Sequence, residues 1–309
     1  MHISKTFYGG VMEKVEILGV KVSKVDYESA MEIIEGFLTD GKKHYVVTPN
    51  PEFIVLARKD SEFRQILNQA DLAIPDGVGL RVGTRVTGTD LMIRLCGLAA
   101  KKGYSVFLLG GRGGVAKEAA KRLEKQFANL NIAGTYEGNP REEFDEDIYR
   151  KLEAVELEAG SLKMDARKEA GNWKLDNSSL KPLASSPAST LQHLASKSLA
   201  SSQASSLKPP ASSIDLLFVA YGAPKQEKWI AKNLPKIPVK VAMGVGGAFD
   251  FIAGKRKRAP KLLRRLGLEW LWRLIQEPQR FPRIFNATIK FPLLVFFHKL
   301  KKSPGGDRG

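Results

Sequence analysis

The segment from Asp215 to Pro260 constrains the fold most, because it contains two apolar runs that each end in a glycine turn. The run 216–220 leads into Gly222-Ala-Pro-Lys-Gln-Glu-Lys-Trp229, and the run 239–243 leads into Gly244-Val-Gly-Gly-Ala-Phe-Asp-Phe251. Strand, polar turn, helix, strand and polar turn is the order in which α/β proteins build a ligand site at the carboxyl ends of parallel strands. The sequence therefore predicts a ligand site at these turns.

The chain up to residue 135 shows the same alternation of strands and helices. The strand cores are continuously apolar, which is typical of parallel sheets that are buried on both faces. We therefore expect an α/β fold with a mostly parallel sheet and helices on both faces. The expected strands cover residues 15–22, 45–47, 72–74, 104–109 and 131–135, and the expected helices cover residues 27–39, 51–58, 60–69, 90–102 and 115–127.

Two changes in composition divide the chain. From about residue 158 to residue 213 the sequence is rich in Ser, Ala, Leu and Lys, and prolines interrupt any helical pattern. Such low-complexity sequence predicts a largely disordered insertion in a surface loop, with a weak amphipathic helix as the alternative. We therefore expect an α/β core over residues 13–254, interrupted by the insertion 158–213, and a C-terminal appendage over residues 255–302.

The appendage holds most of the net positive charge of the protein. Residues 255–302 contain 14 lysines and arginines but only two acidic residues, in a chain whose formal net charge is +16. Tryptophans and leucines lie among these cations at helical spacing, which is typical of an amphipathic helix that rests in the interface of an anionic membrane. The longest late apolar run, residues 291–297, is far shorter than the roughly 20 residues that cross a bilayer. No signal peptide is visible, so we expect a cytoplasmic protein that is peripheral on the inner face of a bacterial cell membrane.

Polar side chains follow two of the expected strands. Asp76 lies in Pro-Asp-Gly directly after residues 72–74, where a carboxylate could act as a general base if it were partly buried. The alternative is an ordinary turn, because Pro-Asp-Gly is a common turn sequence. Thr48 and Asn50 follow the strand 45–47 and offer a hydroxyl and an amide to a sugar or phosphate. Asn50 could also, or instead, cap the helix that begins at Pro51.

Two further turns offer backbone or amide groups. Gly110 and Gly111 open a glycine turn that fits the Gly-x-Gly-x-x-Ala form of a dinucleotide-binding loop, whose N–H groups can hold a diphosphate. This pattern does not separate NAD from a nucleotide sugar. Gln226 follows Pro224 at another strand end, where a solvated helix start is the alternative. The single cysteine, Cys96, and four scattered histidines indicate neither disulfides nor a metal site.

Three arginines of the appendage are candidates for binding phosphate. Arg273, Arg280 and Arg283 could each grip a diphosphate through two N–H groups, because the guanidinium fork matches phosphate geometry. The alternative is a basic, membrane-facing helix without a specific ligand. Both interpretations require an anionic partner.

Several of these segments together resemble the WecG/TagA/CpsF family, which is glycosyltransferase family 26. The likeness covers roughly residues 13 to 300 apart from the Ser-rich stretch, and several independent motifs occur in the same order. The resembling motifs are Thr48-Pro-Asn-Pro-Glu52, Ala70-Asp-Leu-Ala-Ile-Pro-Asp-Gly-Val-Gly79, Arg85-Val-Thr-Gly-Thr-Asp90, Val106-Phe-Leu-Leu-Gly-Gly111, Tyr221-Gly-Ala-Pro-Lys-Gln-Glu-Lys-Trp229, Gly244-Val-Gly-Gly-Ala-Phe-Asp-Phe251, Arg258-Ala-Pro260 and Leu266-Gly-Leu-Glu-Trp-Leu271.

The resemblance implies a Rossmann-like core and an inverting, metal-independent hexosyltransferase without a cofactor. Such an enzyme moves a sugar, commonly N-acetylmannosamine, from a UDP donor to undecaprenyl-diphosphate-linked N-acetylglucosamine in the synthesis of teichoic acid or other cell-surface polysaccharides. The resemblance implies that Asp76 is the base and that the other candidates bind substrate. These binding residues are Thr48, Asn50, Gly110, Gly111, Gln226, Arg273, Arg280 and Arg283.

Two features depart from the family pattern, and two other function classes stay open. The stretch 78–85 is about one helix shorter than the resemblance implies, and the Ser-rich insertion is not a family feature. The glycine turn alone also fits an NAD-type oxidoreductase, and the charge alone fits a non-enzymatic binder of membranes or nucleic acid. Because the charge lies among Trp and Leu, we expect lipid and no nucleic acid as a partner. A homo-oligomer is a further possibility.

Overall fold

The computed structural model describes residues 6–7, 10–76, 79–80, 82, 86–155, 214–260, 262–263 and 266–302. The predicted Ser-rich insertion over residues 158–213 lies outside the described residues, as does most of the short stretch 78–85. The expectations for these two segments therefore stay predictions.

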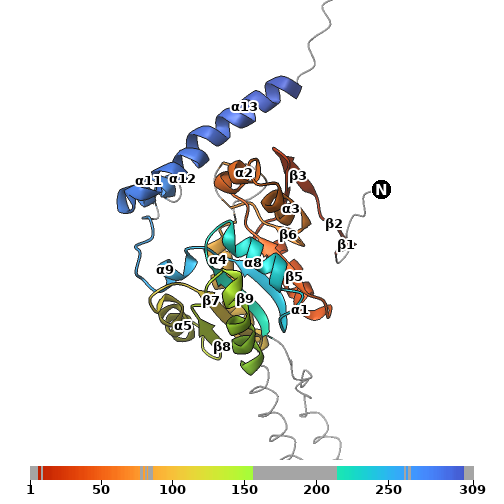
Figure 1. The fold of residues 1–309 in the computed structure, drawn as a ribbon, viewed down its shortest axis with the longest axis vertical. Helices are drawn as coiled ribbons and strands as arrows, with labels where there is room; N and C mark the ends of the chain where they lie inside the picture. The colour runs from red at the N-terminus through yellow and green to blue at the C-terminus, as the bar shows by residue number, and fades with distance from the viewer. Residues whose placement is uncertain are drawn as a thin grey trace, which may run out of the picture. The chain divides into compact units, whose positions relative to one another are not determined.

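A six-stranded parallel sheet forms the centre of the described part of the chain (Figure 1). The sequence-distant strands β5 and β10 are neighbours in it, and β9 lies on the other side of β10. Val241 of β10 is in register with both Leu216 of β9 and His44 of β5. In spatial order the strands are β6 (Leu72–Ala73), β5 (His44–Val47), β10 (Val239–Gly244), β9 (Ile214–Ala220), β7 (Ser105–Gly110) and β8 (Asn131–Tyr136).

Helices cover both faces of this sheet, which confirms the predicted α/β architecture. Leu216 and Phe218 of β9 pack on one side with the side chains of α1, α4, α5 and α9. Leu217 and Val219 point to the opposite side and pack with α8 and with the helix over residues 145–155, while α2 and α3 cover β5 and β6 there. The bounds are α1 (Tyr27–Thr39), α2 (Pro51–Ala57), α3 (Ser61–Gln69), α4 (Gly88–Lys102), α5 (Val115–Gln126), α8 (Lys225–Asn233) and α9 (Ala248–Ile252), with a short turn η1 (Glu142–Phe144) before residue 145.

Polar side chains fix where four of these helices begin. Asp26 accepts a hydrogen bond from the backbone of Ser29 and forms a capping box at α1. Asn50, Asp60 and Thr87 cap α2, α3 and α4 in the same way, each accepting from a backbone N–H three residues later. Each cap satisfies a backbone donor that has no partner within its helix, which is why these helix starts lie close to those predicted from the sequence.

The predicted single strand over residues 15–22 is wrong. The structure has two antiparallel strands here, β3 (Lys14–Ile17) and β4 (Val20–Ser23), joined by a tight turn. Leu18 and Gly19 have φ angles of 51° and 87°, the left-handed conformation that a two-residue hairpin turn requires. The apolar alternation simply continues across the turn, so it could not show the reversal of direction. A second small hairpin, β1 (Thr6–Phe7) and β2 (Gly10–Val11), precedes it.

The helix over residues 145–155 is fastened to α8. Asp145 accepts a hydrogen bond from Trp229 Nε1 at 2.9 Å, and Tyr149 donates to Asn233 Oδ1 at 2.6 Å. This helix follows β8 and leads back toward β9, so it runs against the strand direction. Residue 155 and Ile214, the first residue of β9, therefore both lie at the amino edge of the sheet.

The C-terminal appendage is helical, as predicted, and from Pro278 to Lys302 the helical run is continuous but changes its type along its length. Prolines at positions 278, 282 and 292 each stand within the first two residues of a new stretch, because proline cannot donate a backbone hydrogen bond. Phe291, Leu294 and Val295 pack against the hydrophobic cluster around α2. The pieces are α11 (Glu269–Gln276), η3 (Pro278–Arg280), α12 (Phe281–Phe285), the π-helical turn η4 (Asn286–Lys290) and α13 (Phe291–Lys302).

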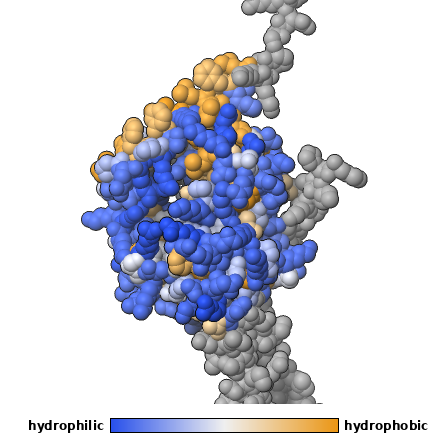
Figure 2. Space-filling model, viewed as in Figure 1, coloured by the Kyte–Doolittle hydropathy of each residue, from blue (hydrophilic) through white to orange (hydrophobic). Residues whose placement is uncertain are grey.

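The other side of these helices is apolar and open to solvent (Figure 2). On α13 the exposed side chains recur at positions 293, 296, 297 and 300, which is one face of a helix. No helix in the described part of the chain is both long and apolar enough to cross a bilayer. The exposed large apolar residues are Leu262, Leu266, Trp270, Leu271, Ile275, Phe281, Phe285, Ile289, Leu293, Phe296, Phe297 and Leu300.

Candidate active site

The turns after β5 and β6 come together at the carboxyl edge of the sheet. The backbone N–H of Asp76 donates to the carbonyl of Pro49 at 2.8 Å, which joins the two turns. Asp76 is half-buried, and its Oδ2 accepts from the backbone N–H of Gly88, the first residue of α4, at 3.4 Å. A Cβ on Gly88 would lie 3.4 Å from Thr48 Cγ2 and 3.6 Å from Asp76 Oδ2. The structure thus gathers Thr48 and Asp76 around the start of α4.

Asn50 has the capping role that the sequence left open. Its Oδ1 accepts from the backbone N–H of Phe53 at 2.9 Å and so begins α2. The side chain is half-buried at the same edge as Asp76. Because Oδ1 serves the cap, Asn50 would meet a ligand through its Nδ2 group, and that contact stays a prediction.

Gln226 joins the two glycine turns that follow β9 and β10. Its Oε1 accepts from the backbone N–H groups of Gly222 and Gly246, each at 3.0 Å. Its Nε2 donates to Glu227 Oε1 at 2.7 Å, and the side chain is buried. Gln226 therefore holds the two turns together by hydrogen bonds, and its contact with a substrate remains a prediction.

Glu227 is a buried carboxyl group that the sequence analysis missed. It is 1% exposed, and its Oε2 has no hydrogen-bond partner among the described residues. Burial raises the pKa of Glu227 to about 7. A Cβ on Gly244 would lie 2.9 Å from Glu227 Oε1, so the glycine leaves the room that this carboxyl group occupies. The available signal was helical spacing, because Gln226 and Glu227 share a face of α8 with Trp229, Ile230 and Asn233.

One N–H group of the glycine turn after β7 is bound within the protein, and the contact of Gly110 and Gly111 with a substrate stays a prediction. Gly110 and Gly111 have φ angles of 102° and 77°, as the tight turn requires. The backbone N–H of Gly114 at the start of α5 donates to Glu137 Oε1 at 2.6 Å. A carboxylate of the protein thus occupies the helix start where a dinucleotide-binding loop would hold phosphate. This arrangement removes the main support for the oxidoreductase alternative.

The predicted arginines lie near one another in the appendage, and one of them pairs with Glu277. Arg280 pairs with Glu277, and Arg256 Nη2 lies 2.6 Å from Glu277 Oε1. Arg273 lies over the ring of Phe251, with its guanidinium carbon 4.9 Å from the ring centre. Burial lowers the pKa of Arg280, and the neighbouring arginines lower it further although Glu277 opposes them. The cluster therefore has more positive charge than its own carboxylate balances, which favours an anionic ligand.

Arg283 connects this cluster to the edge of the sheet. Its Nε lies 3.2 Å from Glu52 Oε1 in the first turn of α2, two residues beyond Asn50. Its Nη2 donates to the carbonyl of Ala223, in the turn after β9, at 3.5 Å. The appendage thus contacts the same edge that carries Thr48, Asn50 and Asp76, although these residues lie more than 200 positions apart in the sequence.

Comparison with known proteins identifies the family. A model of the glycosyl transferase WecG/TagA/CpsF family matches residues 15–159 and 209–305. The chain belongs to this family. Its sequence motifs meet in the structure, since Arg258 of one motif pairs with Asp90 of another, 168 positions away.

Similar proteins carry the name N-acetylglucosaminyldiphosphoundecaprenol N-acetyl-beta-D-mannosaminyltransferase. The one from Bacillus subtilis (strain 168) is 26% identical over 286 residues, which cover 87% of this chain and 88% of the relative. The one from Staphylococcus aureus (strain MRSA252) is 25% identical over 301 residues, covering 94% and 93%. The one from Bacillus spizizenii is 28% identical over 272 residues, covering 85% and 82%.

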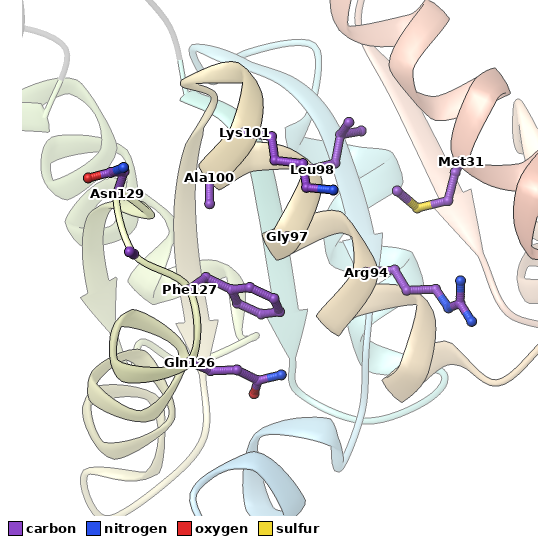
Figure 3. A pocket seen from close by; sticks show the side chains of 10 residues that line it. Met31, Arg94, Gly97, Leu98, Ala100, Lys101, Gln126, Phe127 and Asn129 are labelled. Carbon is purple, nitrogen blue, oxygen red and sulfur yellow. The ribbon is translucent and has the colours of Figure 1, made fainter.

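One depression on this glycosyl transferase lies away from the residues discussed so far (Figure 3). It has a volume of about 670 Å³ and lies between α1, the last turns of α4 and the end of α5. Phe127 forms part of its wall, and a Cβ on Gly97 would lie 3.1 Å from that ring. Helices α4 and α5 run toward the amino edge of the sheet, so the depression is far from Asp76. The convergence of side chains at the carboxyl edge is the better guide to the chemistry.

Proposed function

We propose that this protein transfers N-acetylmannosamine from a UDP donor to N-acetylglucosamine linked to a polyprenyl diphosphate. The names of its relatives support this donor sugar and this acceptor, and the aligned segments cover most of each protein. The observation that carries the proposal is the convergence of Asp76, Thr48 and the arginine cluster at one edge of the sheet. In this protein a base and a set of phosphate-binding cations thus lie around the same turns.

The proposed reaction is a single displacement at the sugar. Asp76 takes the proton from the acceptor hydroxyl as its oxygen forms a bond to the anomeric carbon. The bond from that carbon to the diphosphate breaks, and its electron pair leaves with UDP. One displacement inverts the configuration at the anomeric carbon, as the family resemblance also implies.

The arginines would stabilise the leaving diphosphate. Arg273, Arg280 and Arg283 lie near one another, and in the described residues Arg280 pairs with Glu277 and Arg283 with Glu52. Cations that are already in place when the charge develops stabilise a transition state more than mobile solvent does. We therefore infer that the reaction needs no metal ion or cofactor.

The appendage would also bring the enzyme to its lipid acceptor. Its outward side chains are apolar and its sequence is strongly basic, a combination that binds anionic membrane surfaces. Contact at the inner face of the cell membrane would place the carboxyl edge beside the diphosphate of the acceptor. This location, like the role in teichoic acid or related polysaccharide synthesis, is part of the proposal.

The substitution Asp76→Asn tests the proposed base. We expect kcat to fall by about 100-fold or more, because general bases contribute on that order, while UDP still binds. The assay follows UDP release from UDP-N-acetylmannosamine with a short-chain polyprenyl-diphosphate N-acetylglucosamine, and calorimetry measures UDP binding. Asp147→Asn serves as a control, because this exposed carboxylate lies on the helix 145–155. Normal turnover by Asp76→Asn would exclude Asp76 as the base.

A donor screen tests the sugar separately. UDP-N-acetylmannosamine is expected to release UDP faster than UDP-N-acetylglucosamine or UDP-glucose with the same acceptor. Turnover with UDP-glucose but not with UDP-N-acetylmannosamine would contradict the proposed donor while leaving the base untouched.

A further inference from the structure

The basic run at the start of the appendage is held by the core of the protein. Lys255 Nζ donates to the carbonyl of Gly113 at 2.6 Å, and Arg256 Nη1 lies 3.7 Å from Asp250 Oδ2 in α9. Arg258 binds Asp90, whereas Lys257 is exposed. Three of these four cations therefore fasten the appendage, and only part of the run faces solvent as a free charge.

The pair of Arg258 and Asp90 has the geometry of a specific clamp. Nη1 donates to Oδ1 at 2.6 Å and Nη2 donates to Oδ2 at 2.8 Å, so both carboxylate oxygens are engaged by one guanidinium. The two side chains are 25% and 35% exposed, which limits screening by solvent. The hydrogen bonds that Arg258 donates to Asp90 outweigh burial and raise the pKa of Arg258.

Asp90 lies in the first turn of α4 and is tied to the cap of that helix. Its Oδ2 also accepts from Thr87 Oγ1 at 2.7 Å, and Thr87 Oγ1 accepts from the backbone N–H of Asp90 at 3.3 Å. The neighbouring Gly88 donates its backbone N–H to Asp76 Oδ2 at 3.4 Å. Any shift of this turn would thus change the contact between α4 and the proposed base.

The residue before Arg258 is held from the other side by α11. The carbonyl of Lys257 accepts from Trp272 Nε1 at 3.0 Å and from Gln276 Nε2 at 3.1 Å. Helix α11 also carries Arg273 of the arginine cluster. Residues 257 and 258 therefore connect two helices. One is α11, which carries Arg273, and the other is α4, whose first residue contacts Asp76.

We propose that Arg258 is a positioning residue. By holding Asp90, it keeps the first turn of α4 against the Asp76 carboxylate and makes this placement depend on the docked appendage. This inference rests on the proposed role of Asp76 as the base. It predicts that loss of this ion pair slows the chemical step without weakening UDP binding, because both Nη groups of Arg258 are engaged by Asp90.

Kinetics of the full-length protein test the clamp. Arg258→Ala and Asp90→Asn are each expected to lower kcat by about 10- to 100-fold, the cost of misplacing a catalytic group by about 1 Å. The Kd and stoichiometry of UDP binding, measured by calorimetry, should stay within about twofold. Arg258→Lys keeps the charge but not the two-pronged contact, so its kcat should lie between those of Arg258→Ala and the wild type. Lys257→Ala removes an adjacent exposed charge and should leave kcat unchanged.

The double variant separates a shared clamp from two independent effects. Combining Arg258→Ala with Asp90→Asn should lower kcat no further than either single change, because one interaction is lost in each case. The inference would be overturned if the kcat losses of the two single variants multiplied in the double variant. A wild-type kcat in Arg258→Ala would overturn it too, as would a fall in UDP-binding stoichiometry as large as the fall in kcat. If Arg258→Ala fails to fold, the comparison of Arg258→Lys with Asp90→Asn gives the same decision. Failure of the proposed function shows differently, as normal turnover by Asp76→Asn.

Discussion

At the scale of single residues, Glu227 stands out because its carboxyl group is buried at the functional edge with one hydrogen bond from Gln226. Burial raises its pKa from the ordinary 4.5 to about 7, so the folded protein holds this proton more tightly than the unfolded chain does. The stability that depends on the proton is therefore fully present below pH 4.5 and is lost as the pH rises through 7.

We predict that Glu227→Gln stabilises the protein above pH 7 and has much less effect below pH 5. The neutral amide still accepts the hydrogen bond from Gln226 but never ionises, so the difference should approach about 3 kcal/mol at high pH. Urea denaturation of both proteins at pH 5 and pH 8 measures it. A difference that does not change between these pH values would contradict the raised pKa.

His44 would act in the same direction and must be separated from Glu227. Burial lowers the pKa of His44, but contacts with Asp71 and Asp40 outweigh this and raise it. Its stabilising charge is present below pH 6.5 and is lost as the pH rises through the raised pKa. Because His44 occurs in both proteins, its contribution cancels in the comparison of wild type with Glu227→Gln.

The residues that carry the site were predictable to different degrees. Asp76, Thr48 and Asn50 each follow an apolar strand, so their common edge followed from the parallel sheet. The ion pairs that organise this edge, such as Arg258 with Asp90, join distant positions of the chain. The sequence around either residue therefore could not predict them. In the sequence, Glu227 stands between lysines that are typical of a solvated helix start. Its position on the apolar face of α8 was the signal for its burial.

At the scale of elements, the ends of strands β7 and β9 approach each other closely at Gly110. A Cβ there would lie 2.8 Å from the backbone carbonyl carbon of Ala220. Because this neighbour is a backbone atom, it cannot move aside as the end of a flexible side chain could. The φ angle of 102° adds strain for any residue other than glycine. The tight approach lies at the carboxyl end of the two strands, beside the candidate site.

Gly110→Ala is therefore predicted to cost more than about 2 kcal/mol of unfolding free energy. Gly114→Ala is the matched control, because its φ angle is 74° but nothing lies within 4 Å of the new Cβ. Only the left-handed backbone should matter there, at about 1 kcal/mol. Denaturation of the two variants in urea gives both values, and equal losses would show that the contact with Ala220 is unimportant.

The strands and helices themselves were predictable wherever the pattern was regular. Apolar runs predicted all six strands of the parallel sheet, and the runs in β7, β9 and β10 are continuous because an inner strand of such a sheet is buried on both faces. The helix over residues 145–155 was not predicted, since its few apolar positions come just before the Ser-rich stretch. The packing of the appendage against α2 joins distant positions of the chain, so the sequence does not display it.

At the scale of the whole molecule, α13 has two different faces. Phe291, Leu294 and Val295 pack inward beside α2, whereas Phe296 and Phe297 are 58% and 56% exposed. Side chains of this size are normally covered when they form a continuous stripe. The proposed membrane surface would cover them.

Replacing Phe296 and Phe297 together with serine should weaken binding to anionic liposomes at least about tenfold, because two apolar side chains no longer leave water. The urea midpoint should not change, since both side chains are already exposed. Leu294→Ala is the matched change on the inner face and should lower stability while leaving liposome binding nearly intact. Sedimentation with phosphatidylglycerol vesicles measures the partition, and unchanged binding by the serine variant would show that this stripe does not face lipid.

The amino edge of the sheet, where the described part of one helix reaches residue 155 and where Ile214 begins β9, offers a practical opportunity. A reporter domain or an immobilisation tag spliced in between these two positions would be attached on the side opposite to Asp76. The enzyme could then be held on a bead with the carboxyl edge of its sheet pointing outward, so that this edge could contact vesicles that carry the acceptor.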